Sequence, residues 1–428
     1  LPLVARHGPP GQLEPFRMPI APSENPARRT FLFDNLRAWP GGCVETLAMT
    51  FLVLIAVRVF HAEAWQKATL VAASSCGLLL SLFPVQLVRR TGISVNAGTA
   101  LLWFMSAGGL LIAALGGKTM GVFLPSMVGA LLCITLSIPL MSQIYRKHYP
   151  DRSRGRLFAS TAVVRKSSAL VVAAVFGKVL ENNLDDFRWI LLIYSLCCCL
   201  MAGCVLAMER VHLQRANQIR LFGALEHVRE DRIFRSMLTS WMILGFGNLL
   251  CWSIFVEYVS NPEYGYRLTE FTIAFITGSL PEIMFLITVV AWGIIFDRAN
   301  FFGVRMILNL FFIGGIFFYF FVHEVWALCI GISLHGIGRA GGNIAWSLWV
   351  TKFAKAEQVA EYMSVHTFFC GVRGVIAPFV AFPMIAILGP RWVGGAGVIC
   401  IFVATLMIWP HLRMKGGIGA TPLEPDPR

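Results

Sequence analysis

The stretch LFASTAVVRKSSALVVAAVFGKVL at residues 157–180 and the stretch YMSVHTFFCGVRGVIAPFVAFPMIAIL at residues 362–388 each place an arginine deep inside a long apolar segment. These arginines, Arg165 and Arg373, are 208 residues apart and occupy matching parts of the two halves of the chain. A charged side chain in a bilayer costs several kcal/mol, roughly 3 on insertion scales, so it usually faces a bundle interior or a water-filled cavity. The pair predicts a duplicated membrane protein with a polar interior.

The composition favours the same class of protein. Of the 428 residues, 57% are hydrophobic and 14% are charged, whereas about 25% are charged in a soluble domain. The apolar residues form continuous blocks, and a block of about 20 residues spans the hydrocarbon as one helix. Because these blocks lack the alternation of barrel strands, an all-α integral membrane protein is expected.

Twelve transmembrane helices are predicted from these blocks. They run from Ala38 to Phe60, Ala68 to Val88, Ala97 to Gly117, Met120 to Tyr145, Leu157 to Leu180, Trp189 to Met208, Met237 to Val259, Phe271 to Phe296, Val304 to Val322, Val325 to Val350, Tyr362 to Leu388 and Val393 to Ile408. The implied plan is a flexible tail at 1–37, a six-helix bundle at 38–208, a linker at 209–236, a second six-helix bundle at 237–408 and a tail at 409–428.

Basic residues mark one side of the membrane. They follow the second, fourth and sixth spans, at Arg89 and Arg90, at 146–156 and at 210–235. By the positive-inside rule both termini, the linker and these loops are cytoplasmic in a plasma membrane. The net charge of +13 is thus spread by topology and expected to touch anionic lipid head groups, so nucleic acid is not an expected partner.

An offset of 208 residues relates further positions. Arg90 falls on Arg298, Lys147 on Lys355 and Ala169 on Ala377, with the basic linker between the two sets of six spans. Internal repeats that meet at the membrane midplane are how many secondary transporters form an alternating-access cavity. The repeat makes transport of a small solute the first hypothesis, and we expect a monomer.

The loop after the eighth span carries a recognisable motif. It reads Gly293, Ile294, Ile295, Phe296, Asp297, Arg298, and then Gly303 and Arg305. This resembles the Gly-x-x-x-Asp-Arg signature of the major facilitator superfamily, and the resemblance implies twelve helices in two pseudo-symmetric six-helix bundles. It also implies a cytoplasmic latch, in which Gly293 lets helices approach, Asp297 pairs with a helix N-terminus, and Arg298 and Arg305 are the basic companions of Asp297.

The chain departs from this family pattern in its first half. There the equivalent stretch reads VQLVRR at residues 85–90, without the glycine and the aspartate. The fourth span lacks the arginine of many proton-coupled members, and the fifth lacks the Gly-Pro signature of drug antiporters. The subfamily is left unassigned.

The tenth span carries a polar stripe. His335, Arg339 and Asn343 stand at i, i+4 and i+8, which places them on one helix face, and nearby glycines permit close helix packing. The stripe indicates an inward-facing wall that contacts substrate. The alternative is that Arg339 caps carbonyls or pairs with an acid to lock the bundle.

The deep arginines Arg165 and Arg373 have two readings, as gating charge pairs or as substrate contacts. Lys166 points about 100° away from Arg165 and is expected to face a neighbouring helix or to reach the interface. Counting Arg165, Lys166, Arg339 and Arg373 against the two embedded acids leaves a surplus of two positive charges. An anionic or zwitterionic solute would compensate it.

The embedded acids are Glu45 in the first span and Glu282, beside Pro281, in the eighth. A buried carboxylate is a candidate proton carrier, and Pro281 can kink its helix. For Glu282 the alternative is a permanent partner to Arg339 or Arg373. Glu257 and Glu270 stand near the outer ends of their spans and are expected to be solvated.

Other function classes fit less well. The cysteines at 197–199 point about 100° apart on a helix and lack the spacing of a zinc site, so neither a metal nor another cofactor is expected. His335 and His366 have no metal-ligand spacing with an acid, and no nucleophile constellation suggests an enzyme. A non-transporting receptor or assembly scaffold with the same fold is the remaining alternative.

Overall fold

The computed structural model describes residues 26–80, 82–149, 154–213, 226–349 and 359–410, and within them it contains helices and no strand. The elements of the first half are α1 (Pro26–Thr46), η1 (Leu47–Phe51), α2 (Leu52–Arg58), α3 (Ala64–Leu79), α4 (Leu82–Thr91), α5 (Val95–Leu115), α6 (Met120–Leu136), α7 (Ile138–His148), α8 (Arg154–Asn182), η2 (Leu184–Asp186) and α9 (Phe187–Ala207). Those of the second half are α10 (Glu226–Glu230), α11 (Arg232–Ser260), η4 (Pro262–Tyr264), α12 (Glu270–Ala274), η5 (Phe275–Ser279), α13 (Leu280–Arg298), α14 (Phe301–Phe321), α15 (Val325–Leu348), α16 (Val359–Leu388) and α17 (Pro390–Ile408).

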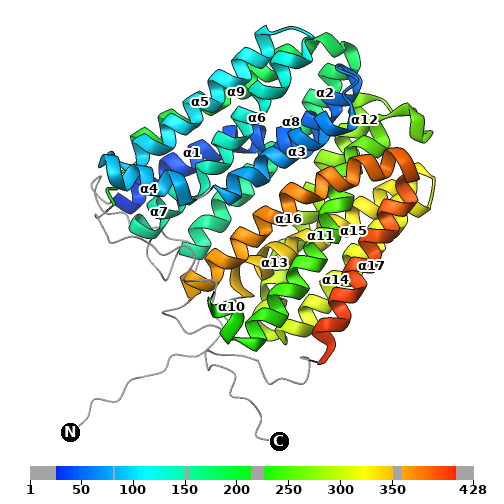
Figure 1. Cartoon of the computed structure of the whole chain (residues 1–428). Coiled ribbons are helices and arrows are strands. Elements are labelled where there is room, and N and C mark those ends of the chain that lie inside the picture. The colour runs from blue at the N-terminus through cyan, green and yellow to red at the C-terminus, as the bar shows by residue number, and fades with distance from the viewer. Residues whose placement is uncertain (1–25, 81, 150–153, 214–225, 350–358, 411–428) are drawn as a thin grey trace, which may run out of the picture.

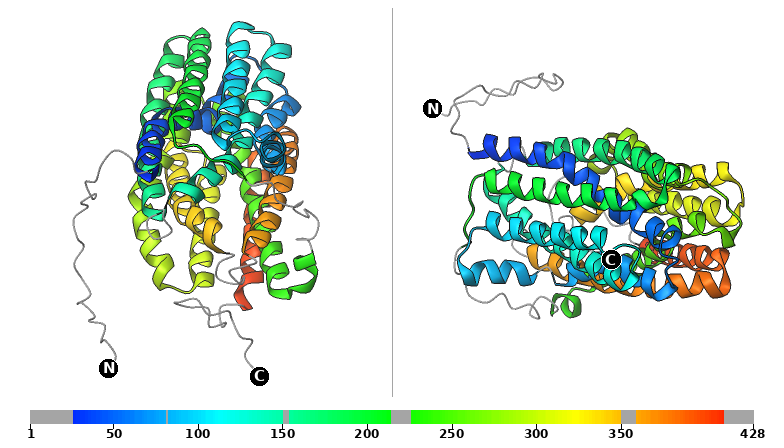
Figure 2. Two further views of the ribbon diagram at one scale, coloured as in Figure 1. Left: turned by 90° about the vertical axis from the view of Figure 1, so that its left-hand side faces the viewer. Right: turned by 90° about the horizontal axis from the view of Figure 1, so that it is seen from above.

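The helices form two bundles that pack side by side (Figures 1 and 2). Two seams join the bundles: α3 packs along α16, and α8 packs against α12, η5 and α13. The start of α1 and the end of α17 lie at the same end of the molecule, as Figure 1 shows. We call this end the terminal face and the other end the opposite face. The two-bundle, all-α architecture expected from the sequence is confirmed.

The described helices are long and apolar enough for a multi-pass membrane protein. Nine of them meet the length and hydropathy of a membrane span, or ten if the bent pair formed by α3 and α4 counts as one. The predicted fifth and tenth spans correspond to α8 and α15, which are helical but are not among these. Both carry the charged residues of the site described below.

Two spans contain a π-helical turn. In the first span α1 and α2 are separated by η1, and in the eighth span α12 and α13 are separated by η5. A π turn holds an extra residue and is frequent at functional sites. The two turns contact each other across the bundles, where Thr50 Oγ1 lies 3.3 Å from Thr277 Oγ1. Pro281 stands in the first turn of α13, two residues after the end of η5.

The first helix begins earlier than the sequence predicts. It starts at Pro26, so residues 26–37 belong to the bundle and the predicted flexible tail at 1–37 is wrong for them. Asp34 is fully buried, accepts hydrogen bonds from Tyr145 at 3.0 Å and Tyr149 at 2.9 Å, and pairs with Arg37 at 2.6 Å. Buried polar groups are stable only when they have partners. These partners allow the charged residues, which made the segment look like a solvated tail, to be buried inside the protein.

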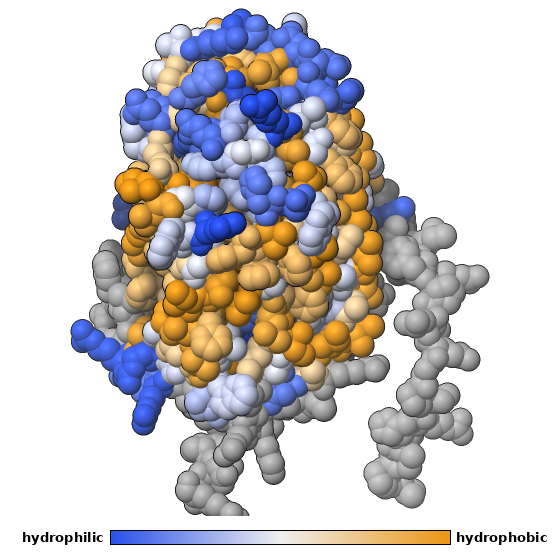
Figure 3. All heavy atoms as spheres, turned by 90° about the vertical axis from the view of Figure 1, so that its right-hand side faces the viewer, coloured by the Kyte–Doolittle hydropathy of each residue, from blue (hydrophilic) through white to orange (hydrophobic). Residues whose placement is uncertain are grey.

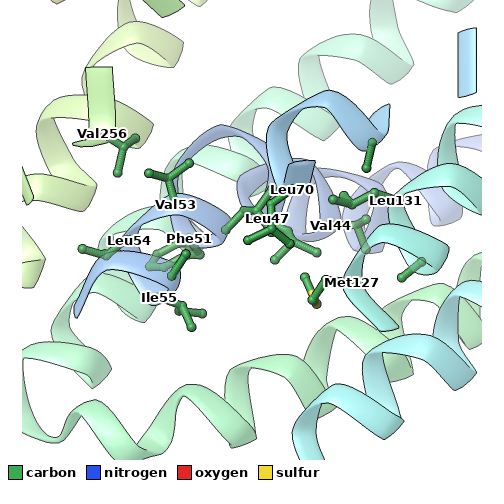
Figure 4. Close-up of a cluster of buried hydrophobic side chains, with 14 of the residues drawn as sticks. Val44, Leu47, Phe51, Val53, Leu54, Ile55, Leu70, Met127, Leu131 and Val256 are labelled. Carbon is green, nitrogen blue, oxygen red and sulfur yellow. The ribbon is translucent and has the colours of Figure 1, made fainter. Parts of the chain in front are cut away.

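Apolar side chains fill the bundles and also cover their outside. Figure 4 shows Val44, Leu47 and Phe51 of the first span packed with Leu70 of α3 and with Met127 and Leu131 of α6. On the outside, side chains such as Ile387 and Val290 are 79% and 69% exposed. Hydrophobic residues spread over much of the surface in Figure 3, while hydrophilic ones gather toward its upper end. Such a surface is suited to lipid.

A close approach of α1 and α8 depends on one glycine. A Cβ at Gly42 would clash with the carbonyl oxygen of Arg165 and stand 2.7 Å from the Cβ of Ser168. Ser168 also donates a 2.8 Å hydrogen bond to the Trp39 carbonyl, which ties the two helices together. The backbone of α8 therefore cannot move away from α1 without losing the Ser168–Trp39 hydrogen bond.

We predict that Gly42→Ala destabilises the protein by about 1–3 kcal/mol, the usual cost of overpacking a filled core. Thermal unfolding of the purified protein in detergent measures the effect. Gly203→Ala is the matched control, because a Cβ there meets nothing within 4 Å. Equal melting temperatures for the two variants would contradict this account of the α1–α8 contact.

Candidate functional site

Five charged side chains from four helices meet where the two bundles face each other. Glu45 of α1 accepts from Lys166 of α8, with Oε1 2.6 Å from Nζ, and its Oε2 lies 3.4 Å from Nε of Arg165. Lys166 also reaches Glu282 of α13, at 3.1 Å between Nζ and Oε2, and Glu282 pairs in turn with Arg339 of α15. We call these residues, Glu45, Arg165, Lys166, Glu282 and Arg339, the central ion network.

The network joins the two bundles through buried charges. Lys166 and Glu282 are 7% and 0% exposed, and the ion pair between them connects α8 to α13. Aromatic rings surround the cations: the ring of Phe285 lies 5.1 Å from Lys166 Nζ and 5.7 Å from Arg339 Cζ. Burying a charge is costly unless it is paired, so each member depends on the others to stay in place.

Both acids of the network flank a π turn. Glu45 stands two residues before η1, and Glu282 stands three residues after η5. The extra residue of a π turn changes the direction in which the following side chains project. The π turns therefore set how Glu282 projects relative to the part of its span before η5, and how Glu45 projects relative to the part of its span after η1.

A cavity of about 610 Å³ lies between the bundles beside this network. It is lined by Glu45, Arg165 and Tyr145 from the first bundle and by Trp252 and Pro378 from the second. Its lining extends along the first span from Leu52, at the start of α2, back to Arg37 in α1, and along α7 to Tyr145 near the end of that helix. The cavity therefore runs from the central ion network toward the terminal face. We call it the central cavity.

A smaller cavity of about 280 Å³ lies within the second bundle. Its cationic lining residues are Arg305, Arg339 and Arg373, and its aromatic ones are Trp241, Phe312 and Trp346. Leu249 lines both cavities, so the two adjoin. We call the smaller one the arginine pocket.

The predicted substrate-contact residues divide between these places. Arg165 lines the central cavity, whereas Arg339, Asn343 and Arg373 line the arginine pocket. His335 lines neither: it is buried, stacks on Trp252 with centroids 5.1 Å apart, and lies 3.0 Å from Asn248 Oδ1. Two interpretations of Arg339 were left open, as part of a cavity wall and as the partner of an acid. In the structure Arg339 lines the arginine pocket and also pairs with Glu282.

The motif residues after the eighth span are only partly described. The backbone of α13 runs through Asp297 and Arg298, whose side chains lie outside the described residues. Among the described residues, a Cβ at Gly293 would meet nothing within 4 Å, so the expected close helix approach at Gly293 stays a prediction. Arg305, expected beside the loop, is instead 2% exposed in α14, with its Cζ 4.1 Å from the Trp241 ring centroid.

Charge pairs also join the bundles near the opposite face. Lys67 of α3 lies 2.6 Å from Glu257 of α11, and Arg58 of α2 lies 3.7 Å from Glu270 of α12. The expectation that the two acids are solvated is wrong for Glu257, which is 1% exposed, and the Glu270 side chain is 14% exposed. Because their partners come from the other bundle, these acids close the opposite face.

Sequence reasoning missed the two lysines that hold the bundles together. Lys166 was expected to face a neighbouring helix or to reach the interface. It does face neighbouring helices, α1 and α13, but its pairing with both network acids, unique among the described residues, was not foreseen. Lys67 stands only three residues after the start of α3 and resembles an interfacial lysine. The available signal was a lysine and an acid at the same depth on different spans, which predicts a pair only when the helix order around the bundle is known.

Comparisons with known proteins identify the fold. No family model and no curated protein matches the sequence. A crystal structure of a mutant of the nucleoside transporter NupG covers 88% of this chain and 99% of its own, with 13% identity and a TM-score of 0.72. A bacterial homologue of the human lysosomal transporter Spinster, inward-facing and occupied, covers 94% and 100% at 14% identity with a TM-score of 0.65. The xylose transporter XylE from E. coli, partially occluded and inward open, covers 91% and 99% at 13% identity with a TM-score of 0.65.

The central ion network gives a prediction for stability. We expect Lys166→Met to cost up to about 3 kcal/mol, at the low end for breaking a buried ion pair, because Arg165 and Arg339 still compensate the two acids. Lys178→Met on the same helix is the control, since this side chain is 61% exposed and surface pairs contribute little. Thermal unfolding in detergent should show a much larger drop for Lys166→Met. Similar drops would refute the structural weight given to Lys166.

Proposed function

We propose that this chain, which has the fold of the major facilitator superfamily, is a secondary transporter that moves a small anionic or zwitterionic solute by alternating access. The observation that carries the proposal is the central cavity. It lies between two bundles, extends toward one face, and ends at buried charges that bridge the bundles. A site with this geometry can be exposed to either side in turn when the bundles rock about it.

The proposed orientation places the terminal face in the cytoplasm of a plasma membrane. It rests on the positive-inside rule, because Arg89 and Arg90, the basic residues at 146–156 and those at 210–235 stand in the sequence at or after the ends of α4, α7 and α9. In this orientation the structure is inward-facing, with the opposite face closed by the Lys67–Glu257 and Arg58–Glu270 pairs. Basic loops beside anionic lipids and a monomeric state belong to the same proposal.

Proton coupling is proposed to use Glu282, with Glu45 as the second acid. Glu282 is the acid through which Arg339 and Lys166 are linked. A proton on its carboxyl would remove the charge that holds both cations and so loosen the seam between α8 and α13. Arrival of an anionic solute at Arg165 or Arg339 would act in the same direction, by replacing a carboxylate of the network as the partner of a cation.

The terminal-face gate is proposed to use the family motif. Asp297 and Arg298 end α13, and the resemblance gives the aspartate the role of an acid that pairs with a helix N-terminus when this face closes. His335 is proposed to act on substrate indirectly, by fixing Trp252, which lines the central cavity.

The first test of transport is a thermal-shift screen of the purified protein against a solute library at two pH values. A ligand that binds the folded state raises its apparent stability. Solutes that stabilise the protein are then offered to proteoliposomes, and entry of the solute supports transport. Binding without any entry or exchange would favour a receptor or scaffold and overturn the proposal.

Replacing Glu282 separates coupling from exchange. We predict that Glu282→Gln abolishes accumulation driven by a pH gradient but retains exchange of labelled solute, because exchange needs alternating access and no net proton movement. A pH-sensitive dye inside proteoliposomes reports the protons, and labelled solute reports exchange. Glu181→Gln at the end of α8 is the control. Continued accumulation in Glu282→Gln would assign coupling elsewhere, first to Glu45.

Replacing Glu257 tests the closed opposite face. We predict that Glu257→Gln leaves Lys67 without its charged partner and opens this face more often. A Ser74→Cys substitution supplies the probe, because Ser74 lines the central cavity and the described residues that line it include no cysteine. Labelling by an impermeant maleimide from the opposite face should rise about tenfold for each 1.4 kcal/mol lost by the closed state. Glu263→Gln, an exposed acid, should leave the labelling unchanged.

A further inference from the structure

The arginine pocket contains two cations, Arg305 and Arg373, that no acid among the described residues compensates. Arg305 is 2% exposed in α14, and Arg373 comes from the middle of α16. Among the described residues no carboxylate forms an ion pair with either of them. Glu282 pairs instead with Lys166 and Arg339. Arg305 and Arg373 line the same cavity, where like charges repel. Buried like charges without a counter-ion are strongly unfavourable.

Both guanidinium groups are held in place by the same tryptophan. Arg305 stacks on the Trp241 ring, and Arg373 donates to the Trp241 carbonyl oxygen. Gly245, one turn further along α11, leaves the space that the guanidinium of Arg373 fills, because a Cβ there would clash with it. Within the part of the chain that the structure describes, the buried Nε of Arg373 has no hydrogen-bond partner. The donors are therefore fixed in position and incompletely used.

We propose that Arg305 and Arg373 form the subsite that binds the charged group of the transported solute, and that this solute is a small organic dianion with a flat apolar body. The inference rests on the proposed transport function and names its substrate class. Guanidinium groups match carboxylate or phosphate oxygens in pairs. Two negative charges would balance Arg305 and Arg373, as the central ion network balances most of its own charge.

The shape of the pocket selects the body of the ligand. Its volume of about 280 Å³ admits a single ring with two acidic groups but little more, and Phe312 and Trp346 provide apolar walls. Flat rings pack well against such aromatic side chains. Leu249, shared with the central cavity, marks where a solute passes between the two. Asn343 and the third arginine, Arg339, stand at the same wall.

The proposal is tested by binding of defined probes to the purified full-length protein. Phthalate has one ring and two carboxylates, benzoate has one carboxylate, and benzamide has the ring without a charge. We expect phthalate to raise the melting temperature and to bind by calorimetry, benzoate to bind more weakly, and benzamide not to bind. Equal effects of phthalate and benzamide would overturn the subsite.

Variants locate the binding. Arg305→Gln and Arg373→Gln should each weaken phthalate binding by about tenfold or more, because each removes hydrogen bonds to a charged group. Arg391→Gln, an exposed arginine at the start of α17, should not. Should the arginine variants fail to fold, Gly342→Val fills the pocket and keeps both cations, since a Cβ at Gly342 is in ordinary contact at 3.5 Å from Phe312. Undiminished phthalate binding by Gly342→Val would refute the assignment.

A lipid head group is the other source of such an anion. Phosphatidylglycerol in mixed micelles is therefore titrated beside phthalate. Stabilisation by the lipid that Arg305→Gln abolishes, together with no effect of phthalate, would replace the solute by a lipid. If neither anion binds while Glu282→Gln still separates accumulation from exchange, the subsite is wrong and the transport function stands.

Discussion

The interaction on which the rest of the structure depends is the contact of Lys166 with two acids from different bundles. An amine that is 7% exposed must find negative charge, and here it finds Glu45 on its own side and Glu282 on the other. Each bundle carries charged residues that it could not bury alone, and the pairing of these residues favours contact between the two bundles. The seams of α3 with α16, and of α8 with α12, η5 and α13, supply the rest of the contact between the bundles.

The two halves repeat one architecture but differ in chemistry. The first bundle contributes Glu45, Arg165 and Lys166 to the network, so it brings one more positive charge than negative. The second contributes Glu282 and Arg339, which balance each other, and keeps Arg305 and Arg373 in a separate pocket. A duplicated fold can thus separate its tasks, with the ion pairs that link conformations at the centre and the uncompensated cations to one side.

Much of this fold was readable from hydropathy, because a helix in lipid must be apolar over about 20 residues. The sequence-based predictions were wrong where the local composition indicates solvent but the folded protein buries the residue. Residues 26–37 are polar enough to predict a tail, but Asp34 finds Arg37, Tyr145 and Tyr149 within the bundle. Glu257 stands near a helix end, where solvent was expected, and is buried beside Lys67. In the candidate site Arg165, Arg339 and Glu282 were identified, since charges inside apolar spans are conspicuous. Their grouping was not, because it depends on which helices are neighbours and on how each is rotated.

The two π turns have a mechanical consequence. An α-helix advances by about 100° per residue, so absorbing or releasing the extra residue of a π turn rotates everything beyond it by roughly that angle. Beyond η5, Glu282 stands three residues away. The carboxylate can therefore be swung from one neighbour to another by a change in helical register that breaks no span. A change in η1 would likewise rotate Glu45, two residues before the turn, relative to the rest of the first span beyond it. Each bundle thus has, at its contact with the other, a π turn next to the carboxylate whose direction the turn can change.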